Sequence, residues 1–205
     1  MRGVKHPVDI AVFEGAWGSS WPDCPPVANL VRRRYAERWV RFHSLLGAKR
    51  YATSAAEHAE ILRRHRALLA ALLDDHPSAD HTLKAITCAW STTPTPTPTL
   101  RDTAVTAAVP EAVHWRSDDI ATEPGFHSWQ HHYVSRIHLD DPALDQLLLC
   151  VADDMTDGVI LTDATCAWIF HPYDGGADVF VGSVEARDRL AAAFADWLPP
   201  TPSGR

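Results

Sequence analysis

The 205-residue sequence has no long hydrophobic run. Its longest apolar stretches, residues 68–73 and 147–151, are far shorter than the roughly 20 residues that a membrane-spanning helix needs. The N-terminal residues also lack an apolar segment followed by a small-residue cleavage site, which marks a secretory signal. We therefore expect no association with membranes and a cytoplasmic location.

Motifs for metals are missing as well. The four cysteines, Cys24, Cys88, Cys150 and Cys166, contain no CxxC pair and no zinc-ligand spacing. We expect them to be buried, reduced thiols, which fits the cytoplasm. The 12 histidines contain no HExxH motif. His127 and His131 are four residues apart, but the alternation around them predicts a strand, so we expect no metal site.

The sequence also lacks the signatures of nucleotide and nucleic-acid binding. The glycine-containing segment GAWGSS has neither the lysine nor the second glycine spacing of a phosphate-binding loop, and no GxSxG nucleophile motif occurs. The formal net charge is -7, and no nucleic-acid-binding motif is present. We expect no cofactor and no nucleic-acid partner.

Charge is distributed unevenly along the chain. Residues 1–70 carry 12 Lys and Arg against 6 Asp and Glu, whereas residues 71–205 carry 7 against 20. One interpretation is that basic elements dock beside acidic segments of the same fold, with weak solvated ion pairs between them. The alternative is a basic face and an acidic face that steer a charged partner.

The clearest structural pattern is at the C-terminus. Cys166, Trp168 and Phe170 alternate as one face of a strand over 165–170, and Asp174-Gly175-Gly176 predicts a tight turn back into a strand over 177–181. Ser183 is a good N-cap for an amphipathic helix with apolar Leu190, Phe194, Trp197 and Leu198, which the prolines from Pro199 onward would end. These elements predict a hairpin with a helix packed on the sheet.

Similar patterns predict the other elements. Val8, Ile10 and Val12 alternate as a short strand, and further strands are expected at 39–43, 86–90, 113–115, 129–137 and 159–161. Helices are expected at 27–38, after a Ser54–Glu57 capping box as far as about Asp74, and after the Asp141-Pro142 pair. A Thr/Pro-rich surface loop is expected at 91–99. The chain is predicted to be a single α+β domain over 1–205, whose antiparallel sheet ends in a β-meander and is flanked by helices.

Two segments carry the side chains best suited to chemistry. In HPYDGGAD, Asp174 and Asp178 flank a turn and could hold a divalent ion while His171 acts as a base, although Asp-Gly-Gly also suits a purely structural turn. In WVRFHSLLGAKRY, a cationic loop could bind phosphate or an acidic partner. His43 and Ser44 there are adjacent on a strand and must point to opposite faces, so they are no catalytic dyad. The candidate cluster from both segments is His43, Arg50, Tyr51, His171, Tyr173, Asp174 and Asp178.

The same two segments resemble an uncharacterised family of bacterial proteins from high-GC genomes, with similar RFHSL…KRY and HPYDGGADV boxes. The C-terminal box is also distantly similar to a small domain of unknown function with a tyrosine, aspartate, glycine and aspartate-valine pattern before a helix that ends in tryptophan. The boxes cover about a third of the chain. The resemblance implies a fold and no catalytic residue.

Two classes of function follow. The first is a non-catalytic cytoplasmic protein that binds another protein, in the manner of an accessory or toxin-neutralising immunity protein; the Trp and Tyr content is typical of interfaces. The second is a hydrolase or phosphate-handling enzyme that uses His43, Arg50, His171, Asp174 and Asp178. This second class requires the two segments to meet at one concave pocket.

Overall fold

The computed structural model describes residues 8–75, 81–97 and 101–200. Both ends of the predicted domain 1–205, and residues 98 and 99 of the predicted Thr/Pro-rich loop, lie outside these ranges. The α-helices are α1 (Ile10–Ser20), α2 (Ala28–Arg34), α3 (Ala55–Asp75), α4 (Thr103–Ala108), α5 (Pro142–Ala152) and α6 (Val184–Ala193). The strands are β1 (Trp39–His43), β2 (Thr82–Ser91), β3 (Val113–Asp119), β4 (Trp129–His138), β5 (Ile160–Thr162), β6 (Ile169–Tyr173) and β7 (Gly176–Phe180).

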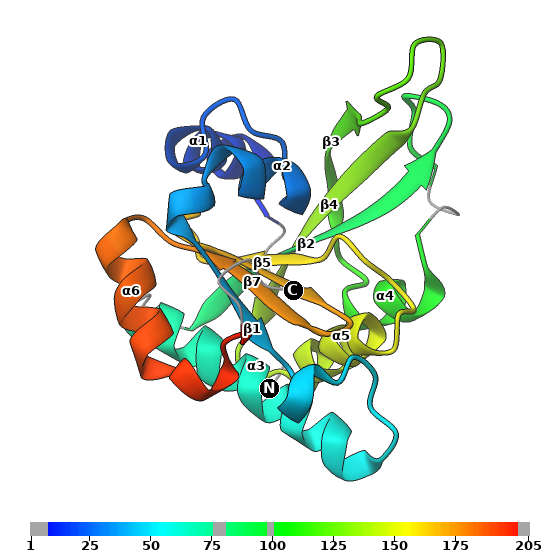
Figure 1. The fold of residues 1–205 in the computed structure, drawn as a ribbon. Coiled ribbons are helices and arrows are strands. Elements are labelled where there is room, and N and C mark those ends of the chain that lie inside the picture. Colours follow the sequence, from blue (N-terminus) through cyan, green and yellow to red (C-terminus); the bar gives the residue numbers. More distant parts are fainter. Residues whose placement is uncertain (1–7, 76–80, 98–100, 201–205) are drawn as a thin grey trace.

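The strands form one sheet of seven in the order β1-β7-β6-β5-β2-β4-β3, and every pair is antiparallel (Figure 1). The last three strands, β5, β6 and β7, are consecutive neighbours, so the predicted C-terminal meander is confirmed. β1 joins from the N-terminal part of the chain and pairs with β7. This pairing brings the two chemically loaded segments side by side.

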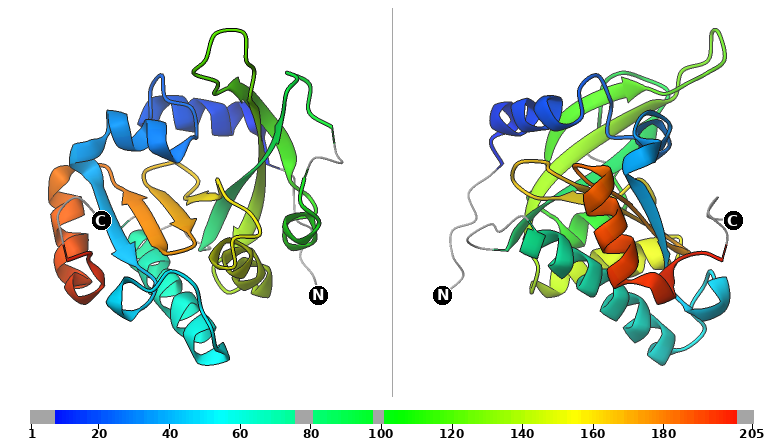
Figure 2. Two further views of the ribbon diagram at one scale, coloured as in Figure 1. Left: turned by 45° about the vertical axis from the view of Figure 1, so that its right-hand side comes forward. Right: turned by 60° about the vertical axis from the view of Figure 1, so that its left-hand side comes forward.

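Helices cover both faces of the sheet (Figure 2). On one face, α3 and α5 bury Leu68, Leu69, Leu147 and Leu148 against strand residues such as Val179. On the other face, α1 and α2 pack over a second core, whose members include Phe13, Trp17, Val31, Ile86, Val134, Ile160, Ile169 and Phe180. Val179 and Phe180 belong to different cores because successive strand residues point to opposite faces.

The predicted strand at Val8–Val12 is wrong, because this segment begins helix α1. Asp9 caps the helix by accepting a hydrogen bond of 3.2 Å from the Val12 amide. Phe13 and Trp17, four residues apart, share one helix face and pack edge-on against Trp115, with ring centroids 4.7 and 5.5 Å away. Three alternating residues fit either element, and this aromatic packing favours the helix.

The predicted strand over 165–170 is wrong at its start. Asp163 accepts hydrogen bonds from the Thr165 hydroxyl at 2.5 Å and the Ala167 amide at 2.7 Å, which closes a turn. Cys166 lies in this turn with φ of 55°, and its side chain joins the α1 side of the sheet. Trp168 packs on the other side, so the two residues do not share a face as predicted.

Other helix limits differ in detail. α6 has the predicted Ser183 cap but ends at Ala193, before the prolines, and continues as a 3₁₀ turn over Ala195–Trp197. Ser54 caps α3 as predicted, whereas the Glu57 carboxylate accepts from the Thr53 amide at 2.7 Å instead of the Ser54 amide. The short helix α4 was not predicted.

All four cysteines are free and buried. Residues 92–97 of the Thr/Pro-rich segment form neither helix nor strand. None of the described helices is both long and apolar enough to cross a membrane.

Candidate functional site

A pocket of about 470 Å³ opens on the sheet face that α2 covers in part. Side chains from β1, β7, β6, β2 and β4 line it, and further lining residues come from the start of α2 and from the turn after α5. The pocket therefore spans most of the width of the sheet. Its charged, aromatic and amide side chains include Arg32, Arg41, Arg50, Trp90, Gln130, Asp154, Asp157, His171, Tyr173, Asp174 and Asp178.

Strand register places three of these residues in one row. Arg41 of β1 pairs with Asp178 of β7, and Asp178 pairs with His171 of β6. The Arg41 guanidinium donates from Nε and Nη2 to the two oxygens of Asp178, at 2.7 and 2.9 Å. This two-point contact fixes both side chains, and the hydrogen bond with Asp178 raises the pKa of Arg41.

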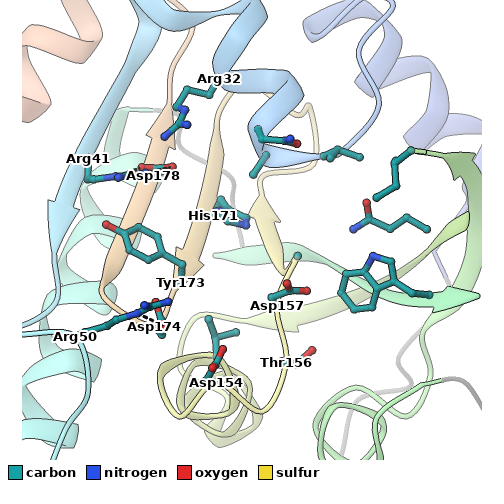
Figure 3. A pocket seen from close by; sticks show the side chains of 18 residues that line it. Arg32, Arg41, Arg50, Asp154, Thr156, Asp157, His171, Tyr173, Asp174 and Asp178 are labelled. Carbon is teal, nitrogen blue, oxygen red and sulfur yellow. Dashed lines mark hydrogen bonds and ion pairs between the residues drawn. The ribbon is translucent and has the colours of Figure 1, made fainter. Parts of the chain in front are cut away.

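A second ion pair lies at the β6–β7 turn. Arg50 Nε donates to Asp174 Oδ2 at 2.5 Å, and the carboxylate of Asp174 is buried. Asp174 and Gly175 make the turn, since Tyr173 pairs directly with Gly176. In Figure 3 this pair and the Arg41–Asp178 pair lie on the same side of His171, with the Tyr173 ring between them.

Gly176 has a steric role in this corner of the site. A Cβ atom at this position would lie 2.0 Å from the carbonyl oxygen of Phe42 on β1 and 3.0 Å from the Tyr173 hydroxyl. None of Asp174, Gly175 and Gly176 has positive φ, so the backbone conformation of this turn does not by itself require glycine. Gly176 is needed because β1 approaches closely there.

Burial sets the protonation of the two ring side chains of β6. It lowers the pKa of His171 to about 4, with Asp178 opposing this shift and Arg41 adding to it. Burial also raises the pKa of Tyr173 to about 12. The histidine is therefore neutral at pH 7, and the phenol keeps its proton.

Arg41 also belongs to a stack of cations and aromatic rings. Its guanidinium carbon lies 4.9 Å from the Tyr173 ring centroid and 5.3 Å from that of Trp39. Arg32 of α2 lies 5.4 Å from the Trp39 ring. These contacts anchor the last turn of α2 beside the pocket.

The other side of the pocket carries a different set of groups. Trp90 of β2 and Gln130 of β4 are register partners, and Asp154 and Asp157 come from the turn after α5. A Cβ atom on Gly158 would lie 3.0 Å from Gln130 Nε2 and 3.5 Å from the Trp90 ring, so the turn packs directly on these two side chains. Figure 3 shows Asp157 and Thr156 across His171 from the two ion pairs.

Five of the seven predicted candidates line the pocket: Arg50, His171, Tyr173, Asp174 and Asp178. His43 and Tyr51 are not among its lining residues. His43 is part-buried on β1, and burial, followed by the charge of Arg41, lowers its pKa. Tyr51 is 43% exposed next to Arg50, and a hydrogen bond with Asp174 raises its pKa.

Sequence reasoning missed half of the site. Arg41 could have been predicted as a site residue. It lies between the apolar residues Val40 and Phe42 of the predicted strand, so its side chain points to the opposite face, and it belongs to the same segment as Arg50. No sequence pattern predicted that one site contains Asp154, Asp157, Trp90 and Gln130. The antiparallel pairing of β2 with β4 and β5 brings these residues together. These four residues come from three separate segments.

Ser44 does contact a histidine, but not His43. The Ser44 hydroxyl lies 2.9 Å from His65 Nε2 of α3, and both side chains are buried. No acidic group contacts His65 Nδ1 among the described residues. The prediction that His43 and Ser44 form no dyad is consistent with this arrangement.

The remaining histidines of the metal hypothesis have other partners. His127 Nδ1 lies 2.5 Å from Asp119 Oδ2, and His131 lies between the Ser91 and Ser117 hydroxyls at 2.8 and 2.7 Å. Within the described ranges, no group of three or more His, Cys, Asp or Glu side chains is arranged to hold a metal ion. Asp174 and Asp178 each contact an arginine instead of converging on one point.

Comparison with known proteins gives a family and no function. No curated protein and no solved structure matches the chain. The model of a domain of unknown function, DUF3885, matches residues 27–202, a range that contains every pocket residue and excludes helix α1. The chain therefore belongs to the family of the domain of unknown function DUF3885.

Proposed function

We propose that this protein is a non-catalytic binding protein, that its binding site is the pocket on the sheet, and that its partner is another protein. A single observation carries the proposal: exposed apolar side chains border a polar pocket. Trp90 is 38% exposed, Met155 in the turn after α5 is 56% exposed, and Tyr51 is 43% exposed beside Arg50. Trp, Tyr, Met and Arg are the residues that protein interfaces favour.

The chemistry of the pocket supports binding over catalysis. Arg41 and Arg50 are held by Asp178 and Asp174, so these groups have fixed orientations suited to recognition. His171 has a pKa of about 4 and is therefore a weak base at neutral pH. The two segments do meet at one pocket, as the hydrolase alternative requires, but His43 is not among the lining residues and the family match names no activity.

The proposal keeps three features inferred from the sequence. They are a bacterial origin, a cytoplasmic location and an accessory or immunity-like role within a single domain over 1–205. The four free cysteines support the cytoplasmic location. The proposal includes neither a nucleic-acid nor a membrane partner.

Affinity capture with matched variants tests the proposal. The tagged protein is used to capture partners from the organism that encodes it, in parallel with a Trp90→Ala/Met155→Ala variant and with Val12→Ala. Val12 is 66% exposed on α1, outside the pocket, and serves as the control. The same protein should be captured by the wild type and by Val12→Ala and lost with the pocket variant. Equal capture by all three, or no reproducible partner, contradicts the proposal.

A further inference from the structure

The pocket contains a set of hydrogen-bond acceptors that the ion pairs leave unused. Gln130 is only 4% exposed, and its Nε2 donates to Cys88 Sγ at 3.2 Å. Its Oε1 is buried and has no hydrogen-bond partner among the described residues. An amide oxygen buried in this way needs a donor, because an unsatisfied acceptor costs about 1–3 kcal/mol.

Two carboxylates lie at the same end of the pocket. Asp154 and Asp157 are exposed residues of the turn after α5, and no hydrogen bond or ion pair joins either carboxylate to another described residue. Burial, together with the charge of Asp154, raises the pKa of Asp157. The nearby cation Arg50 is already held by Asp174 at 2.5 Å. A cation placed here would relieve the repulsion between the two carboxylates.

An aromatic face completes this end. The Trp90 ring lines the pocket, and the backbone at Gly158 packs against Trp90 and Gln130, which places the acidic turn directly beside both. An indole ring attracts cations through its electron-rich face. Carboxylates, an amide oxygen and an indole ring are all groups that favour a cationic N–H donor.

We infer that the end of the pocket formed by Asp154, Asp157, Gln130 and Trp90 binds the cationic side chain of a lysine or arginine on the partner protein. The inference rests on the proposed function, whose partner it describes. The ammonium or guanidinium donates to the carboxylates, and to Gln130 Oε1 once the buried amide turns toward the pocket, and its aliphatic stem lies against Trp90. A divalent metal ion fits less well, because the described residues offer no metal-binding group of three His, Cys, Asp or Glu side chains.

Binding of small probes tests this inference without a partner. Nα-acetyl-lysine N-methylamide is titrated into ¹⁵N-labelled protein, and the Trp90 indole N–H and the amides of 156–158 are followed by NMR. The norleucine analogue has the same stem without the ammonium, and the glutamate analogue has the opposite charge. The lysine probe should shift these signals with a Kd on the order of millimolar, as expected for a ligand of its size. The other two probes should leave them unchanged.

Matched variants locate the site. Asp154→Asn/Asp157→Asn should weaken binding of the lysine probe by at least about tenfold, because it removes both carboxylates. Asp153→Asn changes the charge in the same turn outside the pocket lining, where Asp153 contacts His58 at 2.8 Å, and should change the Kd by less than about twofold. Trp90→Leu should weaken binding by several-fold.

Three outcomes of the probe titrations would contradict the inference about the lysine or arginine side chain. Equal binding of the norleucine probe, stronger binding of the glutamate probe, or saturation of the same signals by Mg²⁺ or Ca²⁺ would overturn the inference. A failure of the proposed function would give another combination of results. The lysine probe would bind, but no captured protein would be lost with the Trp90→Ala/Met155→Ala variant. Conversely, a partner lost with Trp90→Ala/Met155→Ala but retained by Asp154→Asn/Asp157→Asn would support the function and refute the inference.

Discussion

Arg41 and Asp178 lie opposite each other on β1 and β7 and are joined by two hydrogen bonds, of 2.7 and 2.9 Å. The pair links the edge strand that follows α2 to the C-terminal hairpin. The Arg41 side chain is 18% exposed and that of Asp178 is 8% exposed, so solvent screens the pair only in part. Its loss should affect the stability of the fold as well as the pocket.

Removal of one partner tests this link. Asp178→Asn leaves the Arg41 guanidinium without its carboxylate partner and should lower the free energy of unfolding by about 2–3 kcal/mol in urea denaturation. Arg41→Met should cost a similar amount. The double variant Arg41→Met/Asp178→Asn should be more stable than the sum of the two single effects predicts, because each single variant already breaks the whole pair. Additive effects would show that the pair contributes little.

Gly176 should be intolerant of any side chain. Gly176→Ala places a methyl group against the Phe42 carbonyl oxygen, at a contact of 2.0 Å in the present geometry, so β1 has to move away from β7. We expect a loss of about 1–3 kcal/mol or more in the free energy of unfolding. Gly18→Ala is the matched control, since no atom lies within 4 Å of its Cβ position in helix α1. That variant should be neutral or stabilised by about 0.5–1 kcal/mol, and similar effects at both glycines would contradict the steric account.

The buried His65 should make stability depend on pH. Burial lowers its pKa to about 4 in the folded state, so the unfolded chain, with a pKa near 6.5, binds a proton first as the pH falls. Stability that is fully present above about pH 6.5 is lost progressively toward about pH 4. His65 alone should account for about 2 kcal/mol between pH 7 and pH 5. Other histidines with lowered pKa, including the part-buried His171, add to the slope.

Urea denaturation at pH 7 and pH 5 measures this contribution. The pKa values of Glu57 and Glu60 are lowered from 4.5 to about 2 on folding, so their contribution to stability is lost mainly between those two values, below the range from pH 7 to pH 5. His65→Gln should reduce the difference in stability between the two pH values. Ser44→Ala removes the 2.9 Å contact with His65 but keeps the imidazole, so it should lower stability at both pH values and keep the slope. An unchanged slope in His65→Gln would contradict the assignment.

The cysteines should be unreactive in the folded protein. All four are buried, and burial raises the pKa of Cys88 and Cys166 to about 12. Because the thiolate is the reactive form, a thiol reagent at pH 8 should label none of them within minutes in the native state. Under denaturing conditions all four should react. Rapid native labelling of one cysteine would show that its region opens.

The sequence predicted the architecture wherever pattern and chemistry agreed. The hairpin around Asp174-Gly175, the Ser183 cap and the Asp141-Pro142 helix start each combine a turn or capping residue with hydrophobic periodicity, and all three are present in the fold. Errors occurred where a short pattern fitted two elements. Helix α1 begins within the segment Val8–Val12, where a strand was predicted. The helix is favoured because Phe13 and Trp17 pack on Trp115, and this contact joins segments that are about 100 residues apart in the sequence.

Only one half of the candidate site could be predicted from the sequence, namely the residues that come from the segments WVRFHSLLGAKRY and HPYDGGAD. Arg50 and Asp174 are 124 residues apart, yet both belong to segments rich in ionisable side chains, and β1 joins β7. Asp157 and Gln130 had no such signal. Their roles depend on how β2 pairs with both β4 and β5, and no short sequence pattern determines this pairing.

The central claim is that the pocket is the interface with a partner protein. Hydrogen exchange of this chain, with and without the captured partner, tests it most directly. The account predicts slower exchange in the complex at 153–158 and at the start of α2, with no change on α6. Slower exchange confined to α6 or to the outer surface of α1, with the pocket segments unaffected, would contradict it.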